Sequence, residues 1–269
     1  MTAAMWLPIG AKALATALTV ISASIVAEAL GPVWGAIVIC VPVAAGPAYV
    51  FLAMRQGPDF IAASALNSCV ANAVTGLFLM TYAGLVRRVS PWRSLGIATA
   101  GWLVISVAAE QLAWTVGAAI AFNVVVYGTG LLLMNADHAA VPGPVRPLRR
   151  RWFDLPSRAV FVAAFVTLVV TAGDAMGPAA TGIAAVFPVS LISLLVVLVP
   201  RVGGPATARV AIGALPPMVG FGAMLVVLHL AIPPYGVPAA LGLALGVSLV
   251  WSFILVLFQI QRRGRVVSS

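Results

Sequence analysis

The chain has 269 residues, of which 62% are hydrophobic and 8% charged, and its formal net charge is +9. A soluble protein of this length could not cover so apolar a surface, so the composition predicts an integral membrane protein. The basic residues form short clusters between apolar runs, which is typical of topology signals near lipid headgroups and argues against a nucleic-acid partner.

The apolar runs are continuous and about 20 residues long, which predicts helices rather than the alternating strands of a membrane barrel. Nine transmembrane helices are expected, with approximate ranges 8–30, 33–54, 60–86, 94–111, 114–135, 158–173, 178–200, 207–231 and 237–260. The sequence therefore predicts an all-α protein with a single membrane domain, in which the lipid bilayer is the principal partner.

The first span also allows a second interpretation. Lys12, an apolar run and the sequence Ala27-Glu28-Ala29 together have the layout of a signal peptide with a cleavage site. The same layout recurs in the middle of the chain, where Arg158 corresponds to Lys12, and a signal peptide could not be cleaved there. A retained first span is the preferred interpretation.

An internal repeat organises the chain. The stretch from Glu28 to Pro42 returns as the stretch from Asp174 to Pro188, with acid, Gly-Pro and a second proline at identical spacing (174 − 28 = 146). One inserted residue changes the offset to 147 for three later pairs, Gly57/Gly204, Pro58/Pro205 and Pro91/Pro238. Proline accounts for only 19 of 269 residues, so chance is a poor explanation for the matched prolines.

The repeat predicts how the domain is divided. The expected parts are repeat one at about 8–111, a linking fifth helix at 114–135, a cytoplasmic loop at 136–157, repeat two at about 158–260 and a cytoplasmic tail at 261–269. A single extra span between two four-helix units reverses the orientation of the second unit in the membrane, so an inverted 4 + 4 repeat is expected. This arrangement is found in many secondary transporters, although duplicated helices are also kept for packing alone.

The distribution of basic residues predicts the orientation. With nine spans and an outer amino terminus, the inner segments hold Arg87, Arg88, Arg93, Arg146, Arg149, Arg150, Arg151, Arg158, Arg201, Arg209, Arg262, Arg263 and Arg265. Only Lys12 and Arg55 of the 15 basic residues then remain outside. The positive-inside rule therefore predicts a multi-pass protein of the bacterial cytoplasmic (inner) membrane, with the amino terminus outside and the carboxyl terminus in the cytoplasm.

Prolines at matched positions predict interrupted helices. Gly-Pro steps suit helix starts, because proline at the first helical position loses no hydrogen bond. A proline within a span frees a backbone carbonyl that needs another partner in lipid. Paired broken helices indicate a central binding site, although simple bending for packing is an equally open interpretation. The candidate helix-breaking residues are Pro32, Pro42, Pro178, Pro188, Pro216 and Pro217.

Two acids, Glu28 and Asp174, precede matched Gly-Pro steps and are candidates for binding a coupling ion. Carboxylates within a membrane are costly and usually functional. The alternative is that each caps the helix that follows, where the helix dipole favours a negative charge.

A polar stripe runs along the third span, and a similar pair lies in the fifth. At 100° per residue the polar side chains of the third span share one face, which should point toward protein or a cavity rather than lipid. Hydrogen bonding between helices is the competing explanation. The candidate substrate-path residues are Ser64, Asn67, Ser68, Asn72, Thr75, Asn123 and Tyr127.

No catalytic, cofactor-binding or metal-binding motif is recognised, and Cys40 and Cys69 are expected to be buried free thiols. The sequence favours a secondary, ion-coupled transporter of a small solute or lipid-like molecule, with a homodimer as one expected arrangement. The alternatives are a non-catalytic scaffold or assembly subunit of an envelope complex and, third, an intramembrane enzyme acting on lipid.

Overall fold

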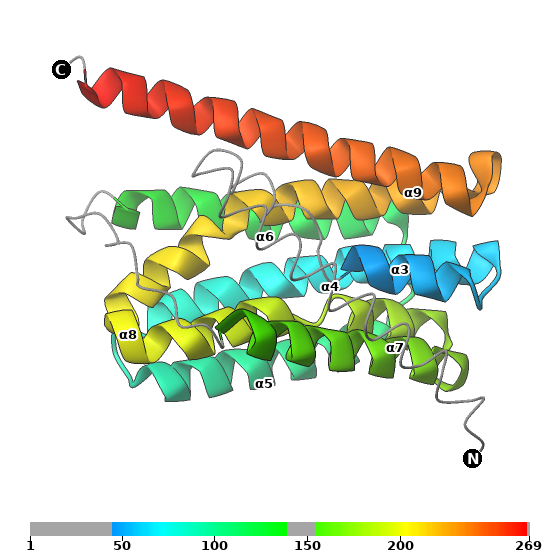
Figure 1. The fold of residues 1–269 in the computed structure, drawn as a ribbon, viewed down its shortest axis with the longest axis horizontal. Coiled ribbons are helices and arrows are strands. Elements are labelled where there is room, and N and C mark those ends of the chain that lie inside the picture. The colour runs from blue at the N-terminus through cyan, green and yellow to red at the C-terminus, as the bar shows by residue number, and fades with distance from the viewer. Residues whose placement is uncertain (1–44, 139–153, 268–269) are drawn as a thin grey trace.

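A computed structural model of the chain describes residues 45–138 and 154–267, so Glu28, Pro32 and Pro42 lie outside the described residues. The described residues form helices and connecting turns, and no strand occurs among them. The helices run side by side along one direction and form an elongated bundle (Figure 1). They are α3 (Ala45–Ala53), α4 (Pro58–Leu85), α5 (Pro91–Glu110), α6 (Val116–His138), α7 (Asp154–Ala185), α8 (Val189–Gly213) and α9 (Leu215–Val267).

Proline marks the start of α4, which carries the polar stripe, and of the next helix, α5. Pro58 follows the extended N-cap Gly57 at the start of α4. Pro91 follows Ser90, whose side chain accepts a hydrogen bond from the backbone N–H of Arg93. A fixed φ and a missing N–H both suit the first helical turn, which explains why helices begin at these positions.

Three glycines interrupt the long helices of the second half. Gly177, Gly203 and Gly236 have φ values of 73°, 73° and 76° with extended ψ, a region that is essentially restricted to glycine. A proline follows each of them within two residues. Helices α7, α8 and α9 therefore each contain two helical parts, and α9 doubles back on itself at one end of the bundle (Figure 1).

Gly177, Gly203 and Gly236 lie where the sequence predicts gaps between spans. Two further breaks lie inside predicted spans, at residues 186–188 and at Ala214, which separates α8 from α9 within the span predicted at 207–231. Residues 186–188 leave the helical conformation between α7 and α8, inside the span predicted at 178–200. Pro188 is the N-cap of α8. Proline has no N–H to donate and restricts the residue before it, which disfavours a continuous helix through this position.

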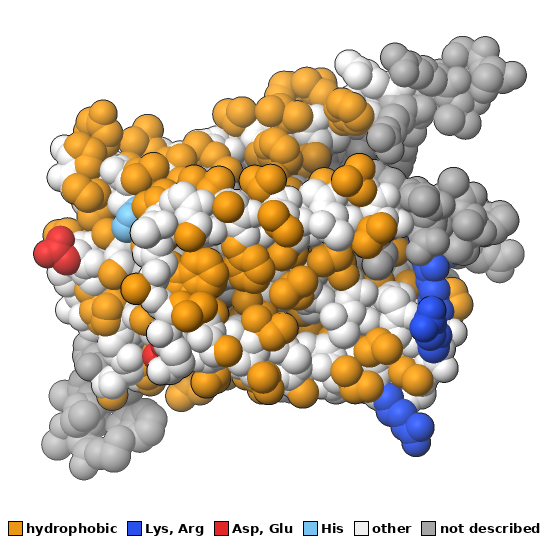
Figure 2. All heavy atoms as spheres, turned by 180° about the vertical axis from the view of Figure 1, so that it is seen from behind, with side chains coloured by type: hydrophobic (Ala, Val, Ile, Leu, Met, Phe, Trp, Pro, Cys, Tyr) orange, Lys and Arg blue, Asp and Glu red, His pale blue; other side chains and the backbone are white. Residues whose placement is uncertain are grey.

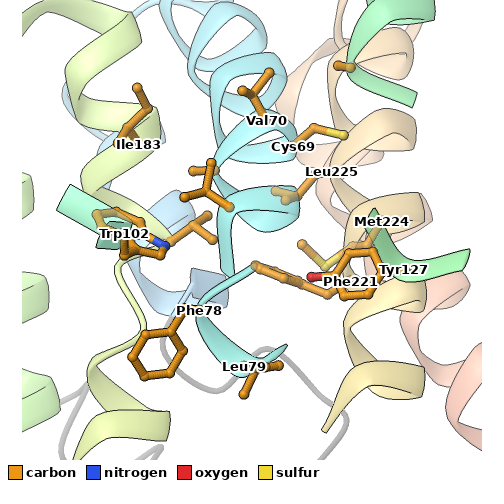
Figure 3. Close-up of a cluster of buried hydrophobic side chains, with 14 of the residues drawn as sticks. Cys69, Val70, Phe78, Leu79, Trp102, Tyr127, Ile183, Phe221, Met224 and Leu225 are labelled. Atoms are coloured by element: carbon orange, nitrogen blue, oxygen red, sulfur yellow. The ribbon is translucent and has the colours of Figure 1, made fainter. Parts of the chain in front are cut away.

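Helix α4 lies at the centre of the bundle, where α5, α6, α7 and α9 cover most of it and α3 and α8 also contact it. Figure 3 shows Ile183 and Trp102 on one side of α4 and Tyr127, Phe221 and Met224 on the other. Most of its residues are buried, including Ile61, Phe78 and Leu79. The helix that carries most of the predicted polar positions is thus the one most enclosed by protein.

Glycines bring the second half very close to α4. A side chain at Gly182 of α7 would overlap the backbone of Ser64 near the start of α4. A Cβ at Gly204 of α8 would lie 3.0 Å from the carbonyl oxygen of Val86, at the end of α4. Gly204 therefore lies at the end of α4 that is opposite to Gly57.

The outer surface of the bundle fits a lipid environment. Four helical stretches in the described part of the chain are long and apolar enough to cross a bilayer: Pro58–Leu85, Pro91–Glu110, Val116–Leu133 and Val189–Phe258, the last of which contains the glycine breaks. On the face shown in Figure 2, apolar side chains cover the middle, basic side chains gather at one end and acidic ones at the other. These features fit a multi-pass membrane protein.

Replacing Gly182 with alanine is expected to destabilise the bundle. The new methyl group would be forced into the backbone of Ser64, and overpacking of this kind costs about 1–3 kcal/mol. Gly101→Ala is the matched control, because a Cβ there meets nothing within 4 Å. Thermal unfolding of the purified protein in detergent should show a lower Tm for Gly182→Ala only, and equal values for both variants would contradict the close approach.

Candidate functional site

The polar stripe of α4 faces other helices. Ser64, Ser68 and Asn72 have 0% exposed surface and Thr75 has 2%, while Asn67 is half-buried. A hydroxyl or carboxamide buried to this extent must bond to protein, because lipid offers it no hydrogen-bonding partner. The partners of each side chain therefore show how α4 is held in place.

The first two serines of the stripe bond to the backbone of α7. The Oγ of Ser64 donates to the carbonyl oxygen of Pro178 at 3.0 Å, and the Oγ of Ser68 donates to the carbonyl oxygen of Gly182. The hydroxyl of Tyr49 in α3 lies 2.6 Å from the Ser68 Oγ and donates to it, since the serine proton is already directed at α7. The stretch that follows the Gly177 break is thus fixed to α4 by two hydroxyl groups.

The centre of the stripe is a pair of carboxamides. The Nδ2 of Asn72 donates to the Oδ1 of Asn123 at 2.9 Å and to the carbonyl oxygen of Met218 at 3.0 Å. The Nδ2 of Asn123 donates in turn to the carbonyl oxygen of Cys69 at 2.8 Å. The hydroxyl of Tyr127 donates to the backbone carbonyl of Asn72 at 2.6 Å. We call Cys69, Asn72, Asn123 and Tyr127 the amide cluster, and it joins α4 to both α6 and α9.

One atom of the amide cluster has no donor. The Oδ1 of Asn72 is buried and accepts no hydrogen bond from the described residues. Rotating the carboxamide would not help, because its oxygen would then face the two acceptors now bonded by Nδ2. A buried acceptor without a donor costs about 1–3 kcal/mol, so this position favours the presence of a hydrogen-bond donor.

The two remaining positions of the stripe each donate a hydrogen bond within α4, and Thr75 also bonds α5. Thr75 donates to the carbonyl oxygen of Ala71 and accepts a hydrogen bond of 3.0 Å from the Nε1 of Trp102 in α5. Asn67 donates to the carbonyl oxygen of Ala63 in its own helix. Asn67 is therefore the stripe residue whose described side-chain hydrogen bond does not link two helices.

Two further hydrogen bonds join α4 to the second half of the chain near its two ends. The Nδ1 of His229 in α9 lies 2.7 Å from the carbonyl oxygen of Ala62. The hydroxyl of Tyr82 donates to the Oγ1 of Thr207 in α8 at 2.8 Å. Together with the Asn72–Met218 bond, these contacts show that residues 204–235 run antiparallel to α4 along its length.

The surroundings of the amide cluster carry no charge in the described residues. Residues 60–85 of α4, 116–133 of α6, 178–185 of α7 and 215–228 of α9 contain no Asp, Glu, Lys, Arg or His. No group of three His, Cys, Asp or Glu side chains among the described residues could hold a metal ion. Among the described residues, the chemistry available here is hydrogen bonding by neutral groups.

The other candidate residues are not members of the amide cluster, and some of them lie outside the described residues. Asp174 is in α7, three positions before the Gly177 break, and so lies at the end of the bundle where that helix turns. Pro178 begins the next helical part, while Pro216 and Pro217 lie in the first turn of α9. The carbonyl oxygen of Pro216 accepts a hydrogen bond of 2.9 Å from the indole of Trp251.

Several participants in this network were not identified from the sequence. Tyr49 and Trp102 were missed, although a hydroxyl or indole inside an apolar span is a usable signal, because each polar atom needs a buried partner. The carbonyl of Met218 has no such signal. Its role depends on which helix lies beside Asn72.

Comparisons of this chain with protein-family models, with curated proteins and with solved structures gave no match.

The two carboxamides should be energetically coupled. A double-mutant cycle of Asn72→Ala and Asn123→Ala, measured by reversible unfolding in detergent, should give a coupling of about 0.5–2 kcal/mol, the range for hydrogen bonds between membrane helices. The control cycle pairs Asn67→Ala with Asn123→Ala and should be additive, since Asn67 bonds its own helix. A zero coupling for the first pair would contradict the direct bond.

Proposed function

We propose that this protein is a secondary, ion-coupled transporter that moves a small solute or lipid-like molecule by alternating access between two inverted repeats of four spans. In this proposal the chain crosses the membrane nine times. The candidate substrate path is the polar stripe of α4 with Asn123 and Tyr127 of α6.

One observation carries the proposal: the contacts between α4 and residues 204–235 are reciprocal. Subtracting the repeat offset of 147 gives each second-half residue its first-half equivalent, so His229 becomes position 82 and Thr207 becomes position 60. In repeat-one numbers, Ala62 contacts position 82 of the other repeat, through His229. Tyr82 in turn contacts position 60 of the other repeat, through Thr207. Any two antiparallel helices exchange partners in this way, and the support for inverted repeats is that the two segments packed antiparallel here are also equivalent in sequence.

The central contact supports the same relation. Met218 becomes position 71 when the offset is subtracted (218 − 147 = 71), so the Asn72–Met218 bond joins two nearly equivalent positions. A contact of this kind lies on or next to a two-fold axis. For two antiparallel helices that cross the bilayer, this axis would lie in the membrane plane, as in inverted-repeat transporters, whose substrates bind near that axis.

The positions of Gly57 and its repeat equivalent Gly204 also support an inverted orientation of the two repeats. Gly57 caps the start of α4, while its equivalent Gly204 packs against Val86 at the opposite end. Arg87, Arg88 and Arg93 flank Val86 in sequence and lie near the end of α4, so the positive-inside rule favours a cytoplasmic location for that end. The Gly57 corner would then face the outside of a bacterial cytoplasmic membrane.

Proposed sites for the coupling ion are Glu28 and Asp174, one near each face. Each precedes a matched Gly-Pro step, and a carboxylate at such a position can bind and release a proton or another cation. Inverted halves would present the two acids to opposite sides, which suits alternating access.

Proton movement through the reconstituted protein tests the coupling. Liposomes with a trapped pH dye and an imposed membrane potential should take up protons through the wild-type protein, and Asp174→Asn should lose most of this flux. Glu110→Gln is the control, because Glu110 ends α5 at a surface corner outside the proposed path. Unchanged flux in Asp174→Asn would remove Asp174 from the coupling mechanism.

Cysteine labelling tests the inversion directly. Leu30→Cys beside Glu28 and Met176→Cys beside Asp174, each in a background without native cysteines, should react with a membrane-impermeant maleimide from opposite sides. Leu30→Cys is expected to react from the cytoplasm, and Met176→Cys, which replaces a side chain that is 40% exposed, from outside. Labelling of both from one side would exclude inverted repeats.

A scaffold role is the second candidate, and one observation favours it. Every candidate residue on α4, apart from Asn67, bonds a neighbouring helix in this conformation, as a rigid packing element would. Co-purification of a cell-envelope protein in stoichiometric amount, together with the absence of solute or proton flux in liposomes, would support the scaffold role over the transporter.

A further inference from the structure

We propose that the carboxamide oxygen of Asn72 is the anchor of a binding site for a small neutral solute that donates hydrogen bonds, such as an amide or an alcohol. The inference rests on the proposed transport function and specifies its substrate class. It starts from the one acceptor of the amide cluster that has no donor, the Oδ1 of Asn72.

The location of this oxygen suits a transport site. Asn72 has no exposed surface and bonds Met218, its nearly equivalent partner, beside the proposed two-fold axis. A site on that axis is related in the same way to both halves, so both could open to it in turn. The vacant acceptor therefore lies where inverted-repeat transporters bind their substrates.

Gly222 leaves room for the two carboxamides to pack against the backbone of α9. A Cβ at Gly222 of α9 would lie 2.9 Å from the Nδ2 of Asn72 and 3.2 Å from the Oδ1 of Asn123. Both approaches are closer than ordinary van der Waals contact, so a side chain here would displace the amide pair. The absence of a side chain at Gly222 is thus needed for the present orientation of the Asn72 carboxamide.

The chemistry of the cluster favours a neutral ligand. The surrounding described stretches contain no Asp, Glu, Lys, Arg or His, so they offer no side chain that is ordinarily charged to compensate an ion within the membrane. Hydroxyl and amide donors can satisfy the Asn72 oxygen at the cost of far less desolvation. The alternative occupant is a structural water molecule, which would bond this oxygen without any transport role.

Cys69 provides a built-in reporter for the site. Its thiol is buried with 1% exposed surface and lies 3.4 Å from the Nδ2 of Asn123. The chain has two cysteines, so Cys40→Ser leaves Cys69 alone. A small neutral thiosulfonate, hydroxyethyl methanethiosulfonate, reacts with the thiolate, so modification of Cys69 should be fast only when water reaches the amide cluster.

The experiment measures the rate of Cys69 modification in the full-length protein in liposomes. We expect Cys69 to react faster than a cysteine at Ala71, which is equally buried at the same depth but points to another side of α4. Acetamide or glycerol at about ten times its Kd should slow the reaction about tenfold by mass action, while acetate and methylammonium should not. Asn72→Ala should remove this protection without abolishing labelling.

The outcomes separate the site from the transport function. Equal rates for Cys69 and a cysteine at position 71, or no protection by either neutral solute, would overturn the site and leave a structural water as the occupant of the Asn72 oxygen. Protection by the ions instead would overturn the neutral class. Protection of Cys69 without any solute-driven swelling of the liposomes would support the binding site and refute transport. Swelling that is unaffected by Asn72→Ala would support transport and refute the binding site. Gly222→Ala is the second variant, and it should also weaken protection.

Discussion

Burial of uncharged polar side chains on one central helix is the constraint on which this structure depends. Helix α4 places two serines, an asparagine and a threonine where neither lipid nor bulk water can bond them. Each hydroxyl or amide donor must find an acceptor in a neighbouring helix or in its own backbone. The positions of α7 and α9 against α4, and that of α6 through Asn123, follow from this requirement.

Glycine and proline supply the geometry that makes these bonds reachable. Hydroxyl groups such as that of Ser64 are short, so the partner backbone must come very close, and Gly182 allows α7 to do so. Gly204 allows a similar approach at the other end of α4. The positive-φ glycines before prolines turn the chain sharply between successive helical parts, so that these parts can pack side by side.

The same features connect packing with the proposed mechanism. A hydrogen bond between Asn72 and Met218 holds two nearly equivalent positions together beside the proposed axis, while the oxygen of the same carboxamide keeps an unused acceptor. One side chain can thus stabilise the contact between the halves and still offer a binding group. In a bilayer this combination is economical, because every additional buried polar group would need its own partner.

The sequence by itself determined the membrane class, the helical content of the described part, the approximate helix positions and the polar face of α4. These follow from hydropathy, a 3.6-residue period and proline or glycine placement, which act within a few neighbouring residues. The tertiary structure alone decided that Asn72 bonds the carbonyl of Met218 and the amide of Asn123, and that the serines bond α7. A backbone carbonyl has no sequence signature, and its availability depends on which helix packs beside it and at what depth.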